Sequence, residues 1–161
     1  MPKKPAIIGF VAYSGTGKTT LIEKLITYLT EKKYKISVIK HTHHRFDVDR
    51  PGKDSYRHRE AGAGEVLLVS DQRWVLMHEQ VTIQEMSIEE QLSKLAPCDL
   101  VFLEGFKASP VPKIELWRAD HEECAKNSLK AHTDPYIQAV AYPGGLGAIN
   151  KPVLNKNLPI L

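Results

Sequence analysis

The amino-acid sequence predicts an α/β fold in which helices cover both faces of a mostly parallel β-sheet, so that the molecule has three layers. Two observations support this fold class. Short runs of almost continuously apolar, β-branched residues recur along the chain, as expected for strands that are buried on both faces. An amphipathic helical pattern separates the first two runs. Strand, helix and strand therefore follow one another within ~35 residues and predict a right-handed βαβ unit.

This βαβ unit occupies the start of the chain. Its first strand is predicted from Ala6 to Val11, and its helix from Lys18 to about Lys32, where apolar side chains recur at helical spacing. Its second strand is predicted from Ile36 to Ile39. A glycine-containing loop connects the first strand to the helix.

A polar loop from His41 to Lys53 follows, and then a short predicted helix from Ser55 to Ala63. The apolar runs Val66–Val69 and Trp74–Met77 flank a polar turn and predict a β-hairpin. We expect this hairpin to add an antiparallel element at the edge of the parallel sheet.

The rest of the chain returns to helix and strand patterns. Ser87 and Glu90 have the spacing of a capping box, which predicts a helix that carries Leu92 and Leu95 on one face. The remaining predicted strands are Leu100–Leu103, Pro112–Trp117 and Ile137–Ala141, and a glycine-rich loop is predicted at 143–147. No repeat or linker interrupts the pattern, so we expect residues 1–161 to form a single domain.

Composition narrows the class of protein. The net charge of +3 is too small to predict nucleic-acid binding. No apolar run approaches the ~18 residues of a membrane span, and the N-terminus lacks the pattern of a signal peptide, so we expect a cytoplasmic location without membrane association. Cys98 and Cys124 are too few and too far apart for a disulfide framework, and we expect both to be small buried residues.

Residues 12–20 form the glycine-containing loop, and their pattern is typical of a phosphate-binding loop in a P-loop NTPase fold. Gly17-Lys18-Thr19 match the end of the common pattern Gly-x-x-x-x-Gly-Lys-Ser/Thr, whereas Ala12 replaces its first glycine. In such a loop, backbone N–H groups surround a phosphate, the lysine reaches the β- and γ-phosphates, and the hydroxyl binds Mg²⁺. The residues predicted to bind the nucleotide are Ser14, Gly15, Thr16, Gly17, Lys18, Thr19 and Thr20.

A carboxylate is expected to complete the Mg²⁺ site. Asp99 and Glu104 bracket one apolar strand and would lie roughly 17 Å apart, so only one of them can reach the ion. The phosphate loop lies at the C-terminal edge of the sheet, because it follows a strand. A parallel strand ends at the same edge, which selects Glu104. We therefore predict Thr19 and Glu104 as metal ligands.

The motifs together closely resemble those of the GTP-binding adaptor proteins of molybdopterin-guanine dinucleotide biosynthesis. The matching segments are Ser14 to Leu21, Lys40-His41-x-His43-His44, Asp47-x-Asp49-x-Pro51-Gly52-Lys53-Asp54-Ser55, Arg59-x-Ala61-Gly62-Ala63 and Glu104-Gly105-Phe106-Lys107. The resemblance implies a homodimer that binds GTP and hydrolyses it weakly. It also implies that the protein assists the guanylyltransferase that joins GMP to molybdopterin, with molybdopterin as a candidate ligand.

The roles of three groups stay open on the sequence. The first group can bind a transition metal or line the nucleotide cleft as a polar loop, and we favour the polar loop. A third possibility is that one of its histidines, or Arg45, contacts phosphate or pterin. This group consists of His41, His43, His44, Asp47 and Asp49. Asp54 either caps the following helix or faces Mg²⁺ through water, which makes it a candidate catalytic residue beside Lys18 and Glu104. Arg57, His58 and Arg59 form a solvated helix face or pair with a pterin phosphate, and we favour the solvated face.

The sequence does not identify the nucleotide base by itself. The Asn-Lys-x-Asp pattern of many GTP-binding proteins is absent, because Val153 and Leu158 stand where the aspartate would follow the two Asn-Lys pairs. We expect the base to lie against the loop after Ala141. The choice of GTP over ATP as the nucleotide is implied by the resemblance alone. Two other functions remain: a small-molecule kinase, which shares the fold and loop, and a metal-delivery GTPase, which the histidines would serve.

Overall fold

The computed structural model describes residues 4–42, 46–82 and 84–142. The chain divides into two compact units, of which the first combines residues 1–41 with 93–161 and the second contains residues 42–92. Elements of the first unit are β1 (Ala6–Val11), α1 (Lys18–Glu31), β2 (Ile36–Lys40), β5 (Leu100–Glu104), β6 (Lys113–Leu116), α4 (Glu122–Lys126), the 3₁₀ helix η1 (Lys130–His132) and β7 (Ile137–Ala141). The elements between β2 and β5 along the chain are α2 (Asp54–Glu60), β3 (Glu65–Val69), β4 (Trp74–His78) and α3 (Ile88–Ser93).

A five-stranded sheet, parallel in every pairing, forms the centre of the first unit. Its strand order is β2-β5-β1-β6-β7, so β1 lies in the middle with β5 on one side and β6 on the other. Phe10 of β1 pairs with Glu104, and Val11 pairs with Glu115. This sheet confirms the predicted α/β class, and all its strands fall where the sequence predicts them.

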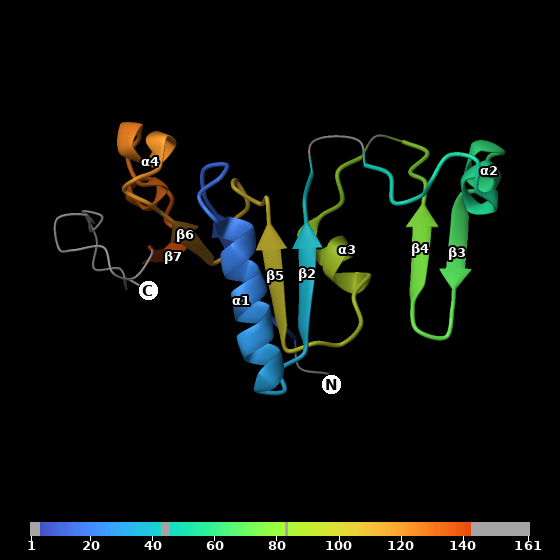
Figure 1. Ribbon diagram of the computed structural model, residues 1–161, viewed down its shortest axis with the longest axis horizontal. Coiled ribbons are helices and arrows are strands. Elements are labelled where there is room, and N and C mark those ends of the chain that lie inside the picture. Colours follow the sequence, from blue (N-terminus) through green and yellow to red (C-terminus); the bar gives the residue numbers. More distant parts are fainter. Residues whose placement is uncertain (1–3, 43–45, 83, 143–161) are drawn as a thin grey trace. The chain divides into compact units, whose positions relative to one another are not determined.

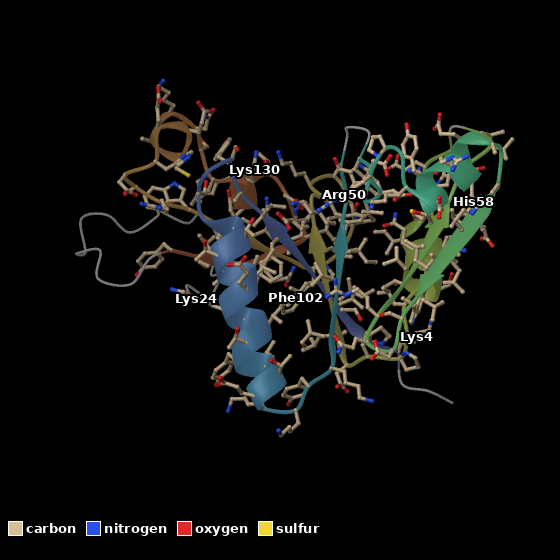
Figure 2. The ribbon with its side chains drawn as sticks, turned by 45° about the vertical axis from the view of Figure 1, so that its right-hand side comes forward. Lys4, Lys24, Arg50, His58, Phe102 and Lys130 are labelled. Atoms are coloured by element: carbon tan, nitrogen blue, oxygen red, sulfur yellow. The ribbon has the colours of Figure 1, made fainter. Side chains whose placement is uncertain are left out.

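One face of the sheet packs against α1, which Figure 1 shows alongside β5. The buried centre of this layer contains Phe10, Phe102 and Ile22, and the two phenyl rings meet edge to face with centroids 5.1 Å apart. Figure 2 shows Phe102 among the side chains beside α1. Because α1 contributes Leu21, Leu25 and other apolar side chains to this core, its first turn is fixed at the end of β1.

The opposite face of the sheet combines an apolar cluster with two buried charged side chains. Val11, Val140 and the η1 residue Ala131 belong to the cluster. Lys113 is only 1% exposed, and its Nζ pairs with Asp134 Oδ2 at 2.6 Å and donates to the carbonyl oxygens of residues 107 and 109 at 3.0 and 2.9 Å. These three partners use all the hydrogen-bonding capacity of the ammonium group, so its burial is compensated.

Glu115 is buried next to this cluster. Its two carboxylate oxygens accept hydrogen bonds from the backbone N–H groups of Lys130 and Ala131, at 2.9 and 2.8 Å. Burial raises the pKa of Glu115, and these two hydrogen bonds act in the opposite direction. The carboxylate therefore holds the start of η1 against β6.

Two features differ from the sequence prediction. Helices α4 and η1 were not predicted, because each has too few residues for an apolar period to show. The predicted hairpin exists, but β3 and β4 pair only with each other and form a two-stranded sheet of their own, whereas we expected them at the edge of the parallel sheet. An alternating pattern identifies strands but does not specify which strand they pair with. The glycine-rich loop predicted at 143–147 lies outside the described residues.

None of the described helices is long and apolar enough to cross a membrane.

The capping box expected before α3 is confirmed. Glu90 Oε2 accepts from the backbone N–H of Ser87 at 2.8 Å, and the Ser87 hydroxyl oxygen accepts from the Glu90 N–H at 3.2 Å.

We predict that Glu115 makes a contribution to stability that decreases as the pH rises. Because burial raises its pKa in the folded state, folding favours the protonated carboxyl, and this contribution is complete below the unfolded-state pKa and lost as the pH rises through the folded-state value. The free energy of unfolding of the wild type, minus that of Glu115→Gln, should therefore decrease as the pH rises from the unfolded-state pKa of this carboxyl through its raised folded-state pKa. Urea unfolding of both proteins measures this difference, and an increase with pH would contradict the prediction.

Candidate functional site

The glycine loop between β1 and α1 adopts the backbone that its sequence predicts. Gly15 and Gly17 have positive φ angles of 78° and 99°, a region that residues with a Cβ rarely adopt. Ala12, which replaces the usual first glycine, is buried in the α1-facing core. Its φ is not positive, because Lys33 is the only described residue other than glycine with a positive φ. Alanine therefore fits this position without backbone strain.

The first turn of α1 leaves its backbone N–H groups available to an anion. Gly17 is the N-cap residue and has no side chain that can accept from these N–H groups. The first turn contains no acidic residue, and it begins with Lys18. A helix start carries partial positive charge and unsatisfied donors, so this one is suited to bind a phosphate group.

The side chains of Lys18, Thr19 and Glu104 come together beside this helix start. The Lys18 Nζ lies 3.3 Å from Glu104 Oε1, and the Thr19 hydroxyl lies 3.5 Å from the same oxygen. The Glu104 side chain is 11% exposed and that of Lys18 is 24% exposed. Glu104 thus lies beside the loop, at the edge of the sheet that strand direction predicts, whereas Asp99 lies at the opposite end of β5 and accepts from the backbone N–H of Lys35 at 2.8 Å.

Gly105 allows the chain to turn directly after Glu104. Its φ is 97°, and a Cβ at this position would lie 2.7 Å from the backbone oxygen of His41. The His41 N–H in turn donates to the Glu104 carbonyl oxygen at 2.8 Å, and its ring meets that of Phe106 edge to face with centroids 5.6 Å apart. The two strand ends that carry Glu104 and His41 are therefore held together by close backbone contact.

A second set of neighbours of the glycine loop could not be found from the sequence. The His121 Nε2 lies 3.3 Å from the position of a Cβ on Gly15, and the buried Thr16 hydroxyl lies 4.0 Å from the Cys124 Sγ. The Lys130 Nζ lies 4.5 Å above the centroid of the Tyr13 ring, and Figure 2 shows Lys130 near the start of α1. These residues lie about a hundred positions from the loop, and no motif marks them.

Within the second unit, Arg59 binds the two aspartates that we considered as metal ligands. Its Nη2 lies 2.9 Å from both Asp47 oxygens, its Nε lies 3.6 Å from Asp49 Oδ2, and its Nη1 lies 2.8 Å from Glu79 Oε1. The backbone N–H of Asp49 and the Arg59 guanidinium lower the pKa of Asp47. Among the described residues, no group of three or more His, Cys, Asp and Glu side chains is arranged to hold a metal ion. His43, His44 and Arg45 lie outside those residues.

Asp54 is the first residue of α2, so it does not cap that helix. The N-cap residue is Lys53, and α2 has no side-chain cap. The Asp54 carboxylate lies 3.8 Å from Arg57 Nη1, and both side chains are largely exposed, at 90% and 74%. The capping role that we considered is wrong, because α2 already begins at Asp54, one residue earlier than a capping aspartate at this position requires. As an acidic residue in the first turn of α2, Asp54 still interacts favourably with the positive end of the helix dipole.

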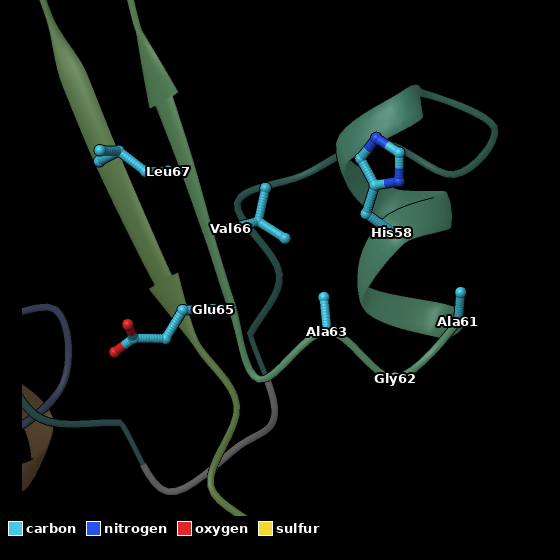
Figure 3. A pocket seen from close by; sticks show the side chains of 7 residues that line it. All are labelled: His58, Ala61, Gly62, Ala63, Glu65, Val66 and Leu67. Atoms are coloured by element: carbon cyan, nitrogen blue, oxygen red, sulfur yellow. The ribbon is translucent and has the colours of Figure 1, made fainter.

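An open hollow of about 590 Å³ lies between α2 and β3 in the second unit, and Figure 3 shows His58, Glu65 and Leu67 among its lining residues. The carboxylate of Glu65 contacts His78 Nδ1 at 2.7 Å. The residues that line this hollow include none from the glycine loop. We assign no binding role to this hollow.

The central parallel sheet places the chain in the class of α/β proteins. Its strand–loop–helix turn presents a lysine, a hydroxyl and a carboxylate beside a helix start that is suited to accept an anion. Comparison with known proteins specifies the family. Residues 7–142 match the model of the MobB family, described as molybdopterin guanine dinucleotide synthesis protein B. The chain belongs to this family, which confirms the resemblance inferred from the sequence.

Individual relatives agree with this assignment. The chain is 44% identical over 139 residues to the molybdopterin-guanine dinucleotide biosynthesis adapter protein of Haemophilus influenzae, covering 85% of this chain and 75% of the relative. It is 46% identical over 114 residues to the Escherichia coli protein of the same name, covering 70% of this chain and 65% of that protein. A crystal structure of Bacillus subtilis MobB has the same fold, with a TM-score of 0.69 at 22% identity, covering 96% of this chain and 88% of that one.

We predict that Gly105→Ala destabilises the protein more than Gly62→Ala. Both glycines have similar positive φ angles, 97° and 102°, but a Cβ on Gly62 would meet no atom within 4 Å. The strained backbone alone should cost about 1–2 kcal/mol at either position. The contact with the His41 backbone oxygen adds to this cost only at Gly105, and urea unfolding measures the difference. Equal losses for the two variants would contradict the close approach.

Proposed function

We propose that this protein is a GTP-binding adapter of molybdopterin-guanine dinucleotide biosynthesis, and that its glycine loop holds the phosphates of GTP. The main support is the convergence of Lys18, Thr19 and Glu104 at the start of α1, in a chain of the MobB family. The names of the relatives support the pathway. The proposed nucleotide contacts are those of residues 14–20.

The Lys18–Glu104 ion pair is suited to exchange its partners when nucleotide and metal bind together. Each group is partly buried and compensates the charge of the other. A phosphate can take the place of the carboxylate at Lys18, while a cation can take the place of the ammonium at Glu104. Each side-chain charge then keeps a partner of opposite sign, so binding of nucleotide and cation should be coupled.

The residues beside the loop fit Mg²⁺, which is a hard cation that prefers oxygen ligands. The Thr19 hydroxyl and the Glu104 carboxylate would hold the ion, and both lie at one point of the site. When bound, Mg²⁺ neutralises charge on the phosphates. Lys18 would hold the β- and γ-phosphates, and Glu104 would orient groups around them.

The adapter function requires a partner surface, and we propose the guanylyltransferase that uses molybdopterin as this partner, in the cytoplasm. The β3–β4 hairpin carries exposed apolar side chains, including Leu67, Val69 and Trp74 at 57%, 71% and 65% exposure. Exposed apolar residues gathered on a small sheet are typical of interaction sites, which supports a homodimer contact or a partner contact there. Molybdopterin remains a candidate ligand.

We predict that Glu104→Gln weakens GTP binding in the presence of Mg²⁺ and leaves it unchanged or tighter in EDTA. Losing one charge-assisted contact costs roughly 1.5–3 kcal/mol, or about 10- to 150-fold in affinity. In EDTA, the lost negative charge can no longer repel the phosphates. Isothermal titration in both buffers measures these affinities.

Asp99→Asn is the matched control for this experiment. It removes the same charge at the other end of β5 and keeps an oxygen that can accept from the Lys35 N–H. Its GTP affinity should equal that of the wild type in both buffers. A larger effect at Asp99 than at Glu104 would reject the proposed site.

We predict that the purified protein alone hydrolyses GTP well below about 1 per second, whereas small-molecule kinases typically reach roughly 1–100 per second. Within the described part of the chain, no hydrogen bond or ion pair joins an arginine to the glycine loop, and fast phosphoryl transfer often needs an arginine from a partner. The measurement is phosphate release with and without the guanylyltransferase and molybdopterin, with Lys18→Ala as the control without nucleotide binding. Many turnovers per second without a partner, or a phosphorylated small molecule as product, would instead support an autonomous enzyme.

A further inference from the structure

The chain segment after β6 lies beside the glycine loop, on the side away from Glu104. Strand β1 pairs with β5 through Phe10 and Glu104 and with β6 through Val11 and Glu115. All three strands are parallel, so the chain leaves β6 at the same edge of the sheet as the loop. The close approach of His121 to Gly15 and of Cys124 to Thr16 places this segment beside the loop.

Within this segment, Arg118 fixes the carboxylate of Asp120. The Arg118 Nε lies 3.0 Å from Asp120 Oδ1, and its Nη2 lies 2.6 Å from Oδ2. The Asp120 side chain is nevertheless 61% exposed and open to a ligand. The Arg118 hydrogen bonds hold the pKa of Asp120 below its usual range, so the group is an ionised acceptor at neutral pH. A carboxylate has about four lone-pair positions, and Arg118 uses two of them.

An oriented carboxylate of this kind distinguishes guanine from adenine. Guanine presents two neighbouring donors, the N1–H and the 2-amino group, and one carboxylate can accept from both. Adenine has an acceptor at N1, next to its amino group. The N1 lone pair would face a carboxylate oxygen and be repelled by it. The planar guanidinium of Arg118 can also lie against the face of a purine ring.

The sequence around these residues has a suggestive spacing. In Asn-Lys-x-Asp, a cationic residue precedes the aspartate by two positions, and Arg118 and Asp120 have the same separation. That relation is not visible as a motif, because Trp117 stands in the place of the asparagine and an arginine replaces the lysine. The relation becomes visible only in the structure, where the segment that carries Arg118 and Asp120 lies beside the glycine loop.

We propose that Asp120 recognises the guanine base of the bound nucleotide, with Arg118 as the positioning residue for its carboxylate. This inference rests on the proposed binding of GTP at the glycine loop. It also replaces the loop after Ala141, most of which lies outside the described residues, as the expected site of base recognition.

The test compares nucleotides that differ only in the base, using the full chain with Mg²⁺ and isothermal titration. Wild-type protein should bind GTP more tightly than ATP, and more tightly than inosine triphosphate, which lacks the 2-amino donor. Asp120→Asn should weaken GTP binding roughly 10- to 100-fold. The same variant should bind xanthosine triphosphate more tightly than wild type does, because the asparagine amide can donate to the carbonyl group that replaces the 2-amino group.

Glu122→Gln is the matched control, since it removes a carboxylate two residues away that forms an ion pair with Lys126. Its affinities should equal those of the wild type. If wild type prefers GTP but Asp120→Asn leaves both GTP and xanthosine triphosphate unchanged, base recognition by Asp120 is overturned while GTP binding stands. Equal wild-type affinity for GTP and inosine triphosphate overturns it without any variant. If wild type binds no guanine nucleotide and Lys18→Ala changes nothing, the proposed function fails as well.

Discussion

The parallel pairing of β1 with β5 determines what the glycine loop can meet. Since both strands run in the same direction and Phe10 lies opposite Glu104, the carboxylate at the end of β5 reaches the loop that follows β1. A register shift of one residue would turn the Glu104 side chain to the other face of the sheet. The ion pair with Lys18, the approach of Thr19 and the close contact between Gly105 and His41 all depend on this register.

The same constraint explains why much of the site could be predicted from the sequence. The glycine loop is continuous in sequence, and its chemistry requires fixed spacing, so Lys18 and Thr19 were identifiable by pattern. Glu104 was identifiable because the direction of a buried parallel strand fixes which of its ends faces the loop. By contrast, His121, Cys124 and Lys130 reach the loop through tertiary packing of the short elements that follow β6, and no local pattern encodes such contacts.

Part of the polar sequence after β2 has a structural explanation that its charge pattern did not reveal. Asp47 and Asp49 were candidates for metal binding, yet both contact Arg59, which also contacts Glu79. Asp49 Oδ1 further accepts from the Ser55 hydroxyl at 2.9 Å, so the aspartates connect the loop to α2. Arg59 lies twelve residues after Asp47 in the sequence, and only folding brings its guanidinium to the aspartates. The charge pattern alone therefore could not show that these aspartates form ion pairs with an arginine.

Lys113 makes the burial of β6 depend on its neighbour β7, the edge strand of the sheet. Gly9 leaves room for the stem of this lysine, because a Cβ there would lie 2.8 Å from its Cγ. The ammonium group finds its carboxylate on Asp134, just before β7, and without that partner a buried charge would be uncompensated. Detachment of β7 would therefore leave the Lys113 charge buried without its carboxylate, so we expect β6 and β7 to open together as one cooperative segment. Because Arg118 and Asp120 follow β6 directly, a disturbance at the outermost strand would be transmitted to the neighbourhood of the glycine loop.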